Sequence, residues 1–84
     1  MTTAAQSVNL LARITVHPAV MVGKPTIRNT RLTVEHLLRA MSSGLTFAQL
    51  HEDYPFLEPD DLRACLLYAS TLVASEKVYI LEAA

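Results

Sequence analysis

Apolar positions along the chain follow a two-residue period near the N-terminus and a helical period after residue 33. The segment Ile14-Thr15-Val16-His17 is β-branched and alternating, which predicts a short strand that ends at Pro18. Thr26-Ile27 and Arg31-Leu32 are further strand candidates, and Asn29 between them tolerates the positive φ of a tight turn. The first part of the chain is therefore expected to form a small hairpin or loop clasp.

Two helices with clear end signals are expected after this hairpin. The first begins after Thr33, which can cap its N-terminus, and ends at Gly44. Its apolar face has helical spacing and contains Val34, Leu37, Leu38 and Met41. The second begins at Thr46, because Thr46 and Gln49 have the spacing of a capping box, and it ends at Tyr54-Pro55.

A third helix is expected to open at Glu58-Pro59-Asp60-Asp61, where proline fits the first turn and the aspartates complement the positive helix end. We expect its main apolar stripe to comprise Leu62, Cys65, Leu66, Ala69, Leu72 and Val73. Further apolar residues lie outside this stripe, so the helix is apolar on more than one face. We therefore predict a homodimer seam or a partner groove formed by Leu67, Tyr68, Thr71 and Val78; burial inside the domain is the alternative.

These elements predict a mostly α fold, in which three helices form a helix-turn-helix bundle after a short N-terminal β-hairpin or strand clasp. We expect one domain over residues 1–84, with residues 1–12 flexible or forming a short helical turn over Ala4 to Ala12, 13–32 forming strands and a loop, and 33–84 helical. The pattern leaves open whether residues 75–84 continue the last helix or form a tail. With 84 residues the chain is small, and 51% of them are hydrophobic, so some apolar surface is expected to meet another chain.

Charge is distributed unevenly along the sequence. Residues 1–44 contain five basic side chains and one acidic one, whereas residues 45–84 contain two basic and seven acidic ones. Lys24, Arg28 and Arg31 cluster around Asn29, and these four residues are the candidate surface for DNA phosphates or for carboxylates of a partner protein. The alternative is that Arg31 braces its own loop. Base reading by the third helix is not expected, because the carboxylates at residues 58–61 would repel phosphates.

No catalytic site, metal site or cofactor is predicted. His17, His36 and His51 lack metal-ligand spacing, and Cys65 lies on the apolar stripe as a small core residue. Two glycines cannot make a phosphate-binding loop, so an enzyme is not expected. The first residues lack the pattern of a secretory signal, and the apolar stretch 64–74 is too short to span a bilayer, which favours a cytoplasmic protein without membrane contact.

Several short motifs occur in the order that is typical of one known family. Ile14-Thr15-Val16-His17-Pro18, followed by Gly23-Lys24-Pro25-Thr26-Ile27-Arg28-Asn29-Thr30-Arg31, resembles the strand, Gly-Lys-Pro step and Gly-Thr-Arg turn of the family called domain of unknown function 433. Later matching pieces are Gly44-Leu45-Thr46, Asp53-Tyr54-Pro55 with Leu57, and Pro59-Asp60-Asp61-Leu62. The resemblance covers roughly residues 13–74. Asn29 replaces a frequent glycine, and Glu58 replaces a common Ser or Thr cap.

This resemblance implies a homeodomain-like three-helix fold and the role of an antitoxin in a bacterial type II toxin–antitoxin pair. Such a protein binds and neutralises a cognate toxin, usually a PIN-like nuclease, and many also bind their operator DNA. The expected partners are therefore a second copy of the chain, a toxin protein and operator DNA. Two other functions stay open, namely a DNA-binding transcriptional regulator without a toxin and a structural protein-interaction module.

Overall fold

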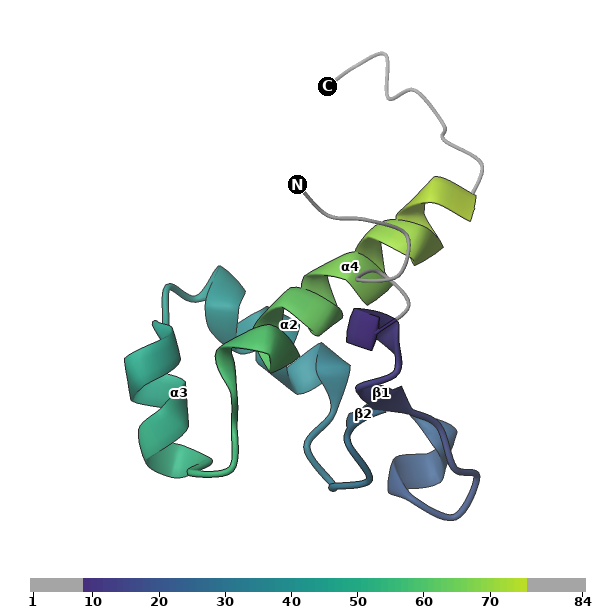
Figure 1. Cartoon of the computed structure of the whole chain (residues 1–84), viewed down its shortest axis with the longest axis horizontal. Coiled ribbons are helices and arrows are strands. Elements are labelled where there is room, and N and C mark those ends of the chain that lie inside the picture. The colour runs from purple at the N-terminus through teal and green to yellow at the C-terminus, as the bar shows by residue number, and fades with distance from the viewer. Residues whose placement is uncertain (1–8, 76–84) are drawn as a thin grey trace.

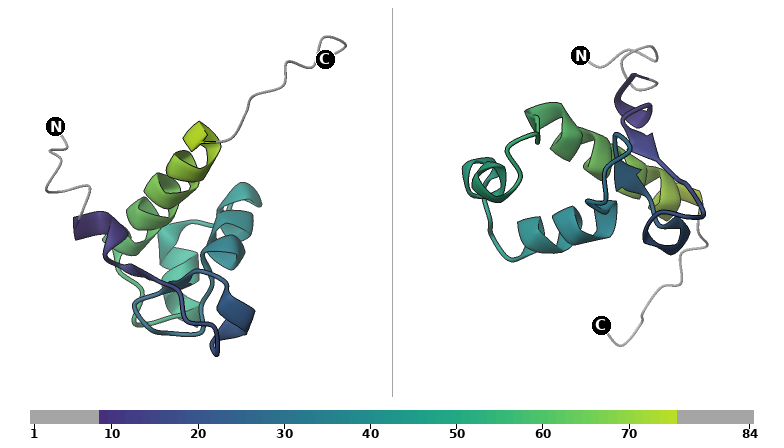
Figure 2. Two further views of the ribbon diagram at one scale, coloured as in Figure 1. Left: turned by 90° about the vertical axis from the view of Figure 1, so that its right-hand side faces the viewer. Right: turned by 90° about the horizontal axis from the view of Figure 1, so that it is seen from below.

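The computed structural model describes residues 9–75, and within these three longer α-helices lie beside one pair of short strands (Figure 1). Residues 9–11 are helical. The elements that follow are β1 (Ile14–Thr15), the short 3-10 helix η1 (Met21–Gly23), β2 (Thr26–Ile27), α2 (Val34–Ser42), α3 (Phe47–Asp53) and α4 (Pro59–Ser75). The strand pair lies beside α4, and α3 lies at the opposite end of the molecule (Figures 1 and 2). The predicted fold class, a three-helix bundle with a short N-terminal strand pair, is confirmed.

The strand pair differs in detail from the expected hairpin. Antiparallel β1 and β2 place Ile14 opposite Ile27 and Thr15 opposite Thr26, so β1 ends two residues before the expected position. Arg31-Leu32 is not a strand, because only an isolated bridge joins Thr26 to Thr33 on the other edge of β2. The hairpin prediction was thus wrong about the partner of β2.

A tight turn follows β2, as the asparagine suggested. Arg28 and Asn29 have φ values of 40° and 61°, and the Thr30 amide donates to the Ile27 carbonyl oxygen over 2.8 Å. Two successive left-handed residues define a type I′ turn, for which asparagine is well suited. The turn directs the Arg28 side chain toward the start of α4, where it makes the contacts described below.

Local signals fix the beginning of α2 and α3 as the sequence predicted. The Thr33 hydroxyl accepts from the His36 amide at 3.0 Å, which caps α2, and Gly44 with φ 91° follows its end. The capping box of α3 is complete, since the Thr46 hydroxyl accepts from the Gln49 amide and the Gln49 side chain accepts from the Thr46 amide. Each pair satisfies backbone amides that the first helical turn leaves without partners.

One apolar core joins β2, the three helices and the connection before α4. Its buried side chains are Ile27, Leu32, Val34, Leu37, Ala40, Leu50, Leu57 and Cys65. Helix α2 packs against α4, and β1 also contacts α4. Among the residues that the structure describes, no helix is both long and apolar enough to cross a membrane.

The buried face of α4 matches the predicted stripe only in part, since Leu62 and Cys65 contact the core as expected. Asp61, Ala64 and Cys65 are buried on α4, whereas Leu66 and Val73 are 55% and 63% exposed. Helix length explains the exposure of the last turns: α2 has nine residues and spans roughly 13 Å, but α4 has 17 and spans roughly 25 Å. Helix α2 therefore covers only part of α4, whose last turns in yellow extend beyond it (Figure 1).

Candidate partner-binding surfaces

A buried carboxylate joins the N-terminal strands to α4. The Asp61 side chain is fully buried, and its two oxygens accept hydrogen bonds from Arg28 Nε at 3.0 Å and Arg28 Nη2 at 2.8 Å. Arg13 Nη1 donates to Oδ1 at 3.0 Å, and the Glu58 amide donates to Oδ2 at 2.9 Å. Arg28 also donates to the Phe56 carbonyl oxygen over 2.7 Å. The interaction between Asp61 and Arg28 is bidentate, which is the strongest geometry for this pair.

These contacts determine the charge state of the cluster. Burial acts to raise the pKa of the Asp61 carboxyl, but hydrogen bonds from Arg28, from the Glu58 amide and from Arg13 outweigh it and hold the pKa below its ordinary value. The hydrogen bond to Asp61 in turn raises the pKa of Arg28. Asp61 thus stays ionised, and its role extends beyond the helix-dipole role that the sequence suggested for the aspartate pair.

The four candidate residues of the basic segment have different surroundings. Arg28 braces its loop against α4, and Lys24 Nζ lies 2.9 Å from a carboxylate oxygen of Glu35. Asn29 occupies the turn, where its side-chain oxygen lies 3.1 Å from His17 Nε2. Arg31 is exposed and makes no ion pair with any residue in the range 9–75. The bracing role proposed for Arg31 is therefore performed by Arg28, and only Arg31 of the three cations presents an uncompensated charge within the described residues.

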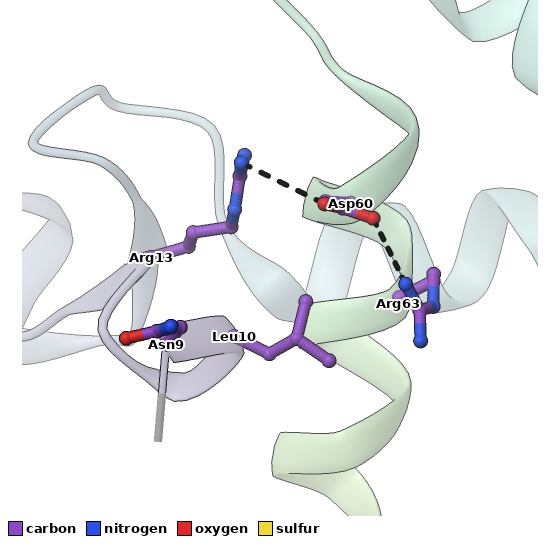
Figure 3. Close-up of a pocket in the computed structure, with 5 residues that line it drawn as sticks. All are labelled: Asn9, Leu10, Arg13, Asp60 and Arg63. Atoms are coloured by element: carbon purple, nitrogen blue, oxygen red, sulfur yellow. Dashed lines mark hydrogen bonds and ion pairs between the residues drawn. The ribbon is translucent and has the colours of Figure 1, made fainter. Parts of the chain in front are cut away.

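A hollow of about 250 Å³ lies beside Arg13 at the start of α4 (Figure 3). Asp60 stands there between two guanidinium groups, 3.1 Å from Arg63 and 3.9 Å from Arg13. Arg13 also pairs with Glu58 at 2.7 Å. Because both cations already face carboxylates, we do not interpret this hollow as an anion site.

From its middle onward, α4 carries exposed apolar side chains. Leu66, Leu72 and Val73 are 55%, 49% and 63% exposed, and Ala69 lies between them on the helix surface. At 100° per residue these four positions cover a continuous sector of the helix. We call this sector the α4 apolar face (Leu66, Ala69, Leu72 and Val73).

The predicted interface residues lie on another side of α4. Leu67 and Tyr68 are half-buried, Tyr68 packs against the core, and Thr71 is exposed with its hydroxyl bonded to a backbone carbonyl of its own helix. Val78 lies outside the described residues. The periodicity did not single out Leu66 and Val73, because both were assigned to the buried stripe.

An apolar groove runs beside this face, between α4 and α2. It has a volume of about 300 Å³ and is lined mainly by Pro25, Val34, Leu38, Tyr68, Ala69 and Leu72. Glu35 and Arg39 also line it, and they pair with each other at 3.2 Å. The groove is continuous with the α4 apolar face through Ala69 and Leu72, so one partner can contact both.

A second groove lies around Arg31, where the sequence indicated only a basic loop. This Arg31 groove has a volume of about 350 Å³, and its lining includes Met21, Arg31, Leu32, His36, Tyr54 and Phe56. Sequence reasoning missed the last three residues as site residues, because His36 lacked metal spacing and residues 54–56 were interpreted only as a helix end. The aromatic residues Tyr54 and Phe56 on both sides of Pro55 were the available signal.

Thiol and imidazole groups elsewhere are part of the structure of the domain. Cys65 is fully buried, and burial, together with the nearby charge of Asp61, raises the pKa of its thiol to about 12. His51 Nδ1 lies 3.1 Å from the Leu57 carbonyl oxygen. Within residues 9–75 no group of three His, Cys, Asp or Glu side chains is placed to hold a metal ion.

Comparison with known proteins identifies the family. The sequence profile of a family described as a protein of unknown function, DUF433, matches residues 14–69. The fold is similar to the crystal structure of a DUF433 member protein from Anabaena variabilis, with a TM-score of 0.66 and 33% sequence identity over 81% of this chain and 68% of that one. No curated protein sequence matches this chain. The profile match over most of the chain and the shared fold show that this protein belongs to the DUF433 family.

Proposed function

We propose that the protein is a non-enzymatic, antitoxin-like binding module that acts in the cytoplasm by docking another protein on the α4 apolar face. The antitoxin role rests on the resemblance described in the sequence analysis, and the partner would then be a cognate toxin, of the PIN-like nuclease type. A second copy of the chain is expected to use the same face, which would make the protein a homodimer.

The observation that carries this proposal is the exposure of Leu66, Leu72 and Val73 on one helix. Complete burial of a Leu or Val side chain stabilises a complex by about 1.5–3 kcal/mol, and each of these three is still about half exposed. Covering them would therefore contribute roughly 3 kcal/mol in total. A continuous apolar face of this kind on a small domain is typical of an interaction surface.

DNA binding is not part of the proposal. Lys24 and Arg28 are paired with Glu35 and Asp61, so the basic segment offers few charges to phosphates. The N-terminus of α4, which would enter the major groove in a helix-turn-helix reader, carries the carboxylates of Glu58 and Asp60. Both features weaken attraction to a nucleic acid backbone.

Co-expression with the protein encoded by the neighbouring reading frame tests the proposal. We expect the two proteins to purify together, and we expect this chain to relieve growth inhibition by the neighbour. The double variant Leu66→Asp/Val73→Asp should abolish both effects. Thr71→Asp is the matched control, because it adds a charge at an exposed position of the same helix on the side opposite the α4 apolar face.

Light scattering after size-exclusion chromatography tests the homodimer. The wild type and Thr71→Asp should elute as dimers, and the double variant as a monomer. A neighbour that binds the double variant as well as the wild type would refute the docking face. Failure of the neighbour to bind either protein would refute the antitoxin role, whereas a wild-type monomer would refute the homodimer alone.

A further inference from the structure

The Arg31 groove carries an inference beyond the proposed function, since it shares no residue with the α4 apolar face. We infer that this groove is a second binding site, which takes an acidic and apolar peptide segment of a partner protein. A carboxylate of the segment would pair with the Arg31 guanidinium, and a neighbouring apolar side chain would pack against Met21, Tyr54 and Phe56.

The aromatic wall of the groove is held in place by contacts with the rest of the domain. Tyr54 Oη lies 3.2 Å from His36 Nε2, and the two rings meet edge to face with centroids 6.0 Å apart. Phe56 lies beside Tyr54 at a centroid distance of 6.2 Å. The Phe56 backbone is fixed by Arg28, whose Nη2 donates to its carbonyl oxygen over 2.7 Å. A wall that is already ordered loses little entropy when a ligand binds.

Charge complementarity indicates an acidic ligand. Residues 9–75 contain six lysine and arginine side chains, and five of them form ion pairs with carboxylates of the same chain. The sixth is Arg31, which is exposed and lines the groove. A planar guanidinium beside aromatic rings is suited to a carboxylate that is attached to an apolar segment.

The size and lining of the groove favour a peptide over other ligands. Its volume of about 350 Å³ is near the lower end of the range for ligand pockets, roughly 300–1,000 Å³, and fits one or two side chains. Met21, Leu32, Tyr54 and Phe56 make the lining largely apolar. A nucleic acid normally needs several cations along its phosphates, and among residues 9–75 Arg31 is the only arginine or lysine that lines the groove.

Selection from a displayed library of short random peptides tests the inference with the full chain as bait. We expect enriched peptides to share an Asp or Glu next to an aliphatic or aromatic residue. The best of them is then synthesised together with a version in which the acidic residue is replaced by its amide. Affinities of both peptides are measured for the wild type and for Arg31→Gln, Phe56→Ala and Arg63→Gln.

The expected result is a coupled loss of affinity. The amide peptide should bind the wild type about tenfold more weakly or worse, because a charge-assisted pair is lost. Arg31→Gln should bind the acidic peptide equally weakly and should no longer distinguish the two peptides. Phe56→Ala should weaken both peptides, while Arg63→Gln, which changes a cation outside the groove, should bind as the wild type does.

Three results would overturn the inference. The first is a selection that enriches no acidic and apolar sequence. The second is an Arg31→Gln protein that still prefers the acidic peptide by the wild-type factor, although circular dichroism shows it folded. The third is binding of a single-stranded or duplex oligonucleotide that depends on Arg31 while peptides bind without selectivity, which would assign the groove to nucleic acid. None of these results bears on docking at the α4 apolar face.

Discussion

Replacement of Asp61 by asparagine tests whether the buried carboxylate joins the two parts of the domain. In the wild type the carboxylate accepts two hydrogen bonds from Arg28, one from Arg13 and one from the Glu58 amide. Asparagine has nearly the same shape, but it is neutral and one of its two polar atoms is a donor. In either orientation that donor faces Arg28, together with Arg13 or with the Glu58 amide, and all of these groups are donors themselves. The variant therefore loses the charge pair and some of the hydrogen bonds together.

The structure indicates a loss of about 3 kcal/mol in the free energy of unfolding. Removal of one partner from a buried ion pair costs roughly 3–5 kcal/mol, because the remaining charge stays buried. Here the Arg13 and Arg28 side chains are 26% and 34% exposed, so water can solvate them in part and the lower end applies. For a domain of this size about 3 kcal/mol corresponds to roughly 12–24 °C in Tm. Since small domains have about 5 kcal/mol or more, the variant should still fold.

Urea denaturation followed by circular dichroism at neutral pH measures this loss. Asp60→Asn is the matched control, since Asp60 is 47% exposed and its ion pairs with Arg13 and Arg63 lie at the surface. We expect the control to lose no more than about 1 kcal/mol. Equal losses for Asp60→Asn and Asp61→Asn would refute the reasoning, because burial would then make no difference.

The difference in free energy of unfolding between the wild type and Asp61→Asn should depend on pH with a defined sign. The pKa of Asp61 is lowered in the folded protein, so the carboxylate contributes its full stability above the ordinary carboxyl pKa, near 4, and loses it as the pH falls toward the folded value. The difference between the wild type and Asp61→Asn should therefore shrink below about pH 4. Lys24 and Arg39 lower the pKa of Glu35 in both proteins, so that effect cancels. A difference that grows in acid would contradict the assignment.

Three further experimental outcomes are predicted from local geometry. Asn29→Val should lower the free energy of unfolding by about 1–2 kcal/mol in urea, because a β-branched residue disfavours φ 61°, while Asn29→Gly should be near neutral. Thr46→Ala should cost about 1 kcal/mol in thermal denaturation, since it removes the hydroxyl that caps α3; an unchanged Tm would contradict the capping box. Cys65 should react slowly with iodoacetamide in the native protein and rapidly in urea, because its thiol is buried and its pKa is raised to about 12; fast native labelling would disprove this.

Helix boundaries could be predicted because their signals are local. Thr33, Thr46 and Gly44 act on backbone groups within three or four residues of themselves, so sequence spacing alone specifies the contacts. The turn at Asn29 belongs to the same class, since the left-handed conformation depends on the residue itself. Strand pairing is not local in this way: β2 pairs with β1, whereas the prediction paired it with the nearer segment Arg31-Leu32.

The role of Asp61 could not be predicted from its neighbour, because Asp60 and Asp61 give the same signal for a helix start. Arg28 and Arg13, which decide the difference, lie 33 and 48 positions away in the sequence. One local indication existed: Asp61 is four residues before Cys65, so both lie on one face of α4. An aspartate on the face of a predicted core residue requires buried partners.

Which face of α4 is buried could not be predicted, for a related reason. Apolar residues occur on nearly every side of this helix, so periodicity permits several buried faces. The choice is made by the tertiary contacts of its first half, where Asp61 must face the arginines and Ala64 and Cys65 are fully buried. Leu66 and Val73 are exposed as a consequence of that choice.

This division of α4 predicts that stability and binding can be separated by position. Its first half is held by the Asp61 cluster and the core, whereas residues 71–75 are all exposed. Val73→Asp should therefore change the free energy of unfolding by no more than about 0.5 kcal/mol and still abolish docking, because its side chain contacts little in the folded chain. Ala64→Val should lower stability, since the site is fully buried and a larger side chain overpacks it by about 1–3 kcal/mol, yet the protein that remains folded should dock normally. Urea denaturation and a partner-binding assay on both variants test whether stability and docking are separable. If Val73→Asp unfolds the domain, the last turns of α4 belong to the fold and the α4 apolar face is not a separate surface.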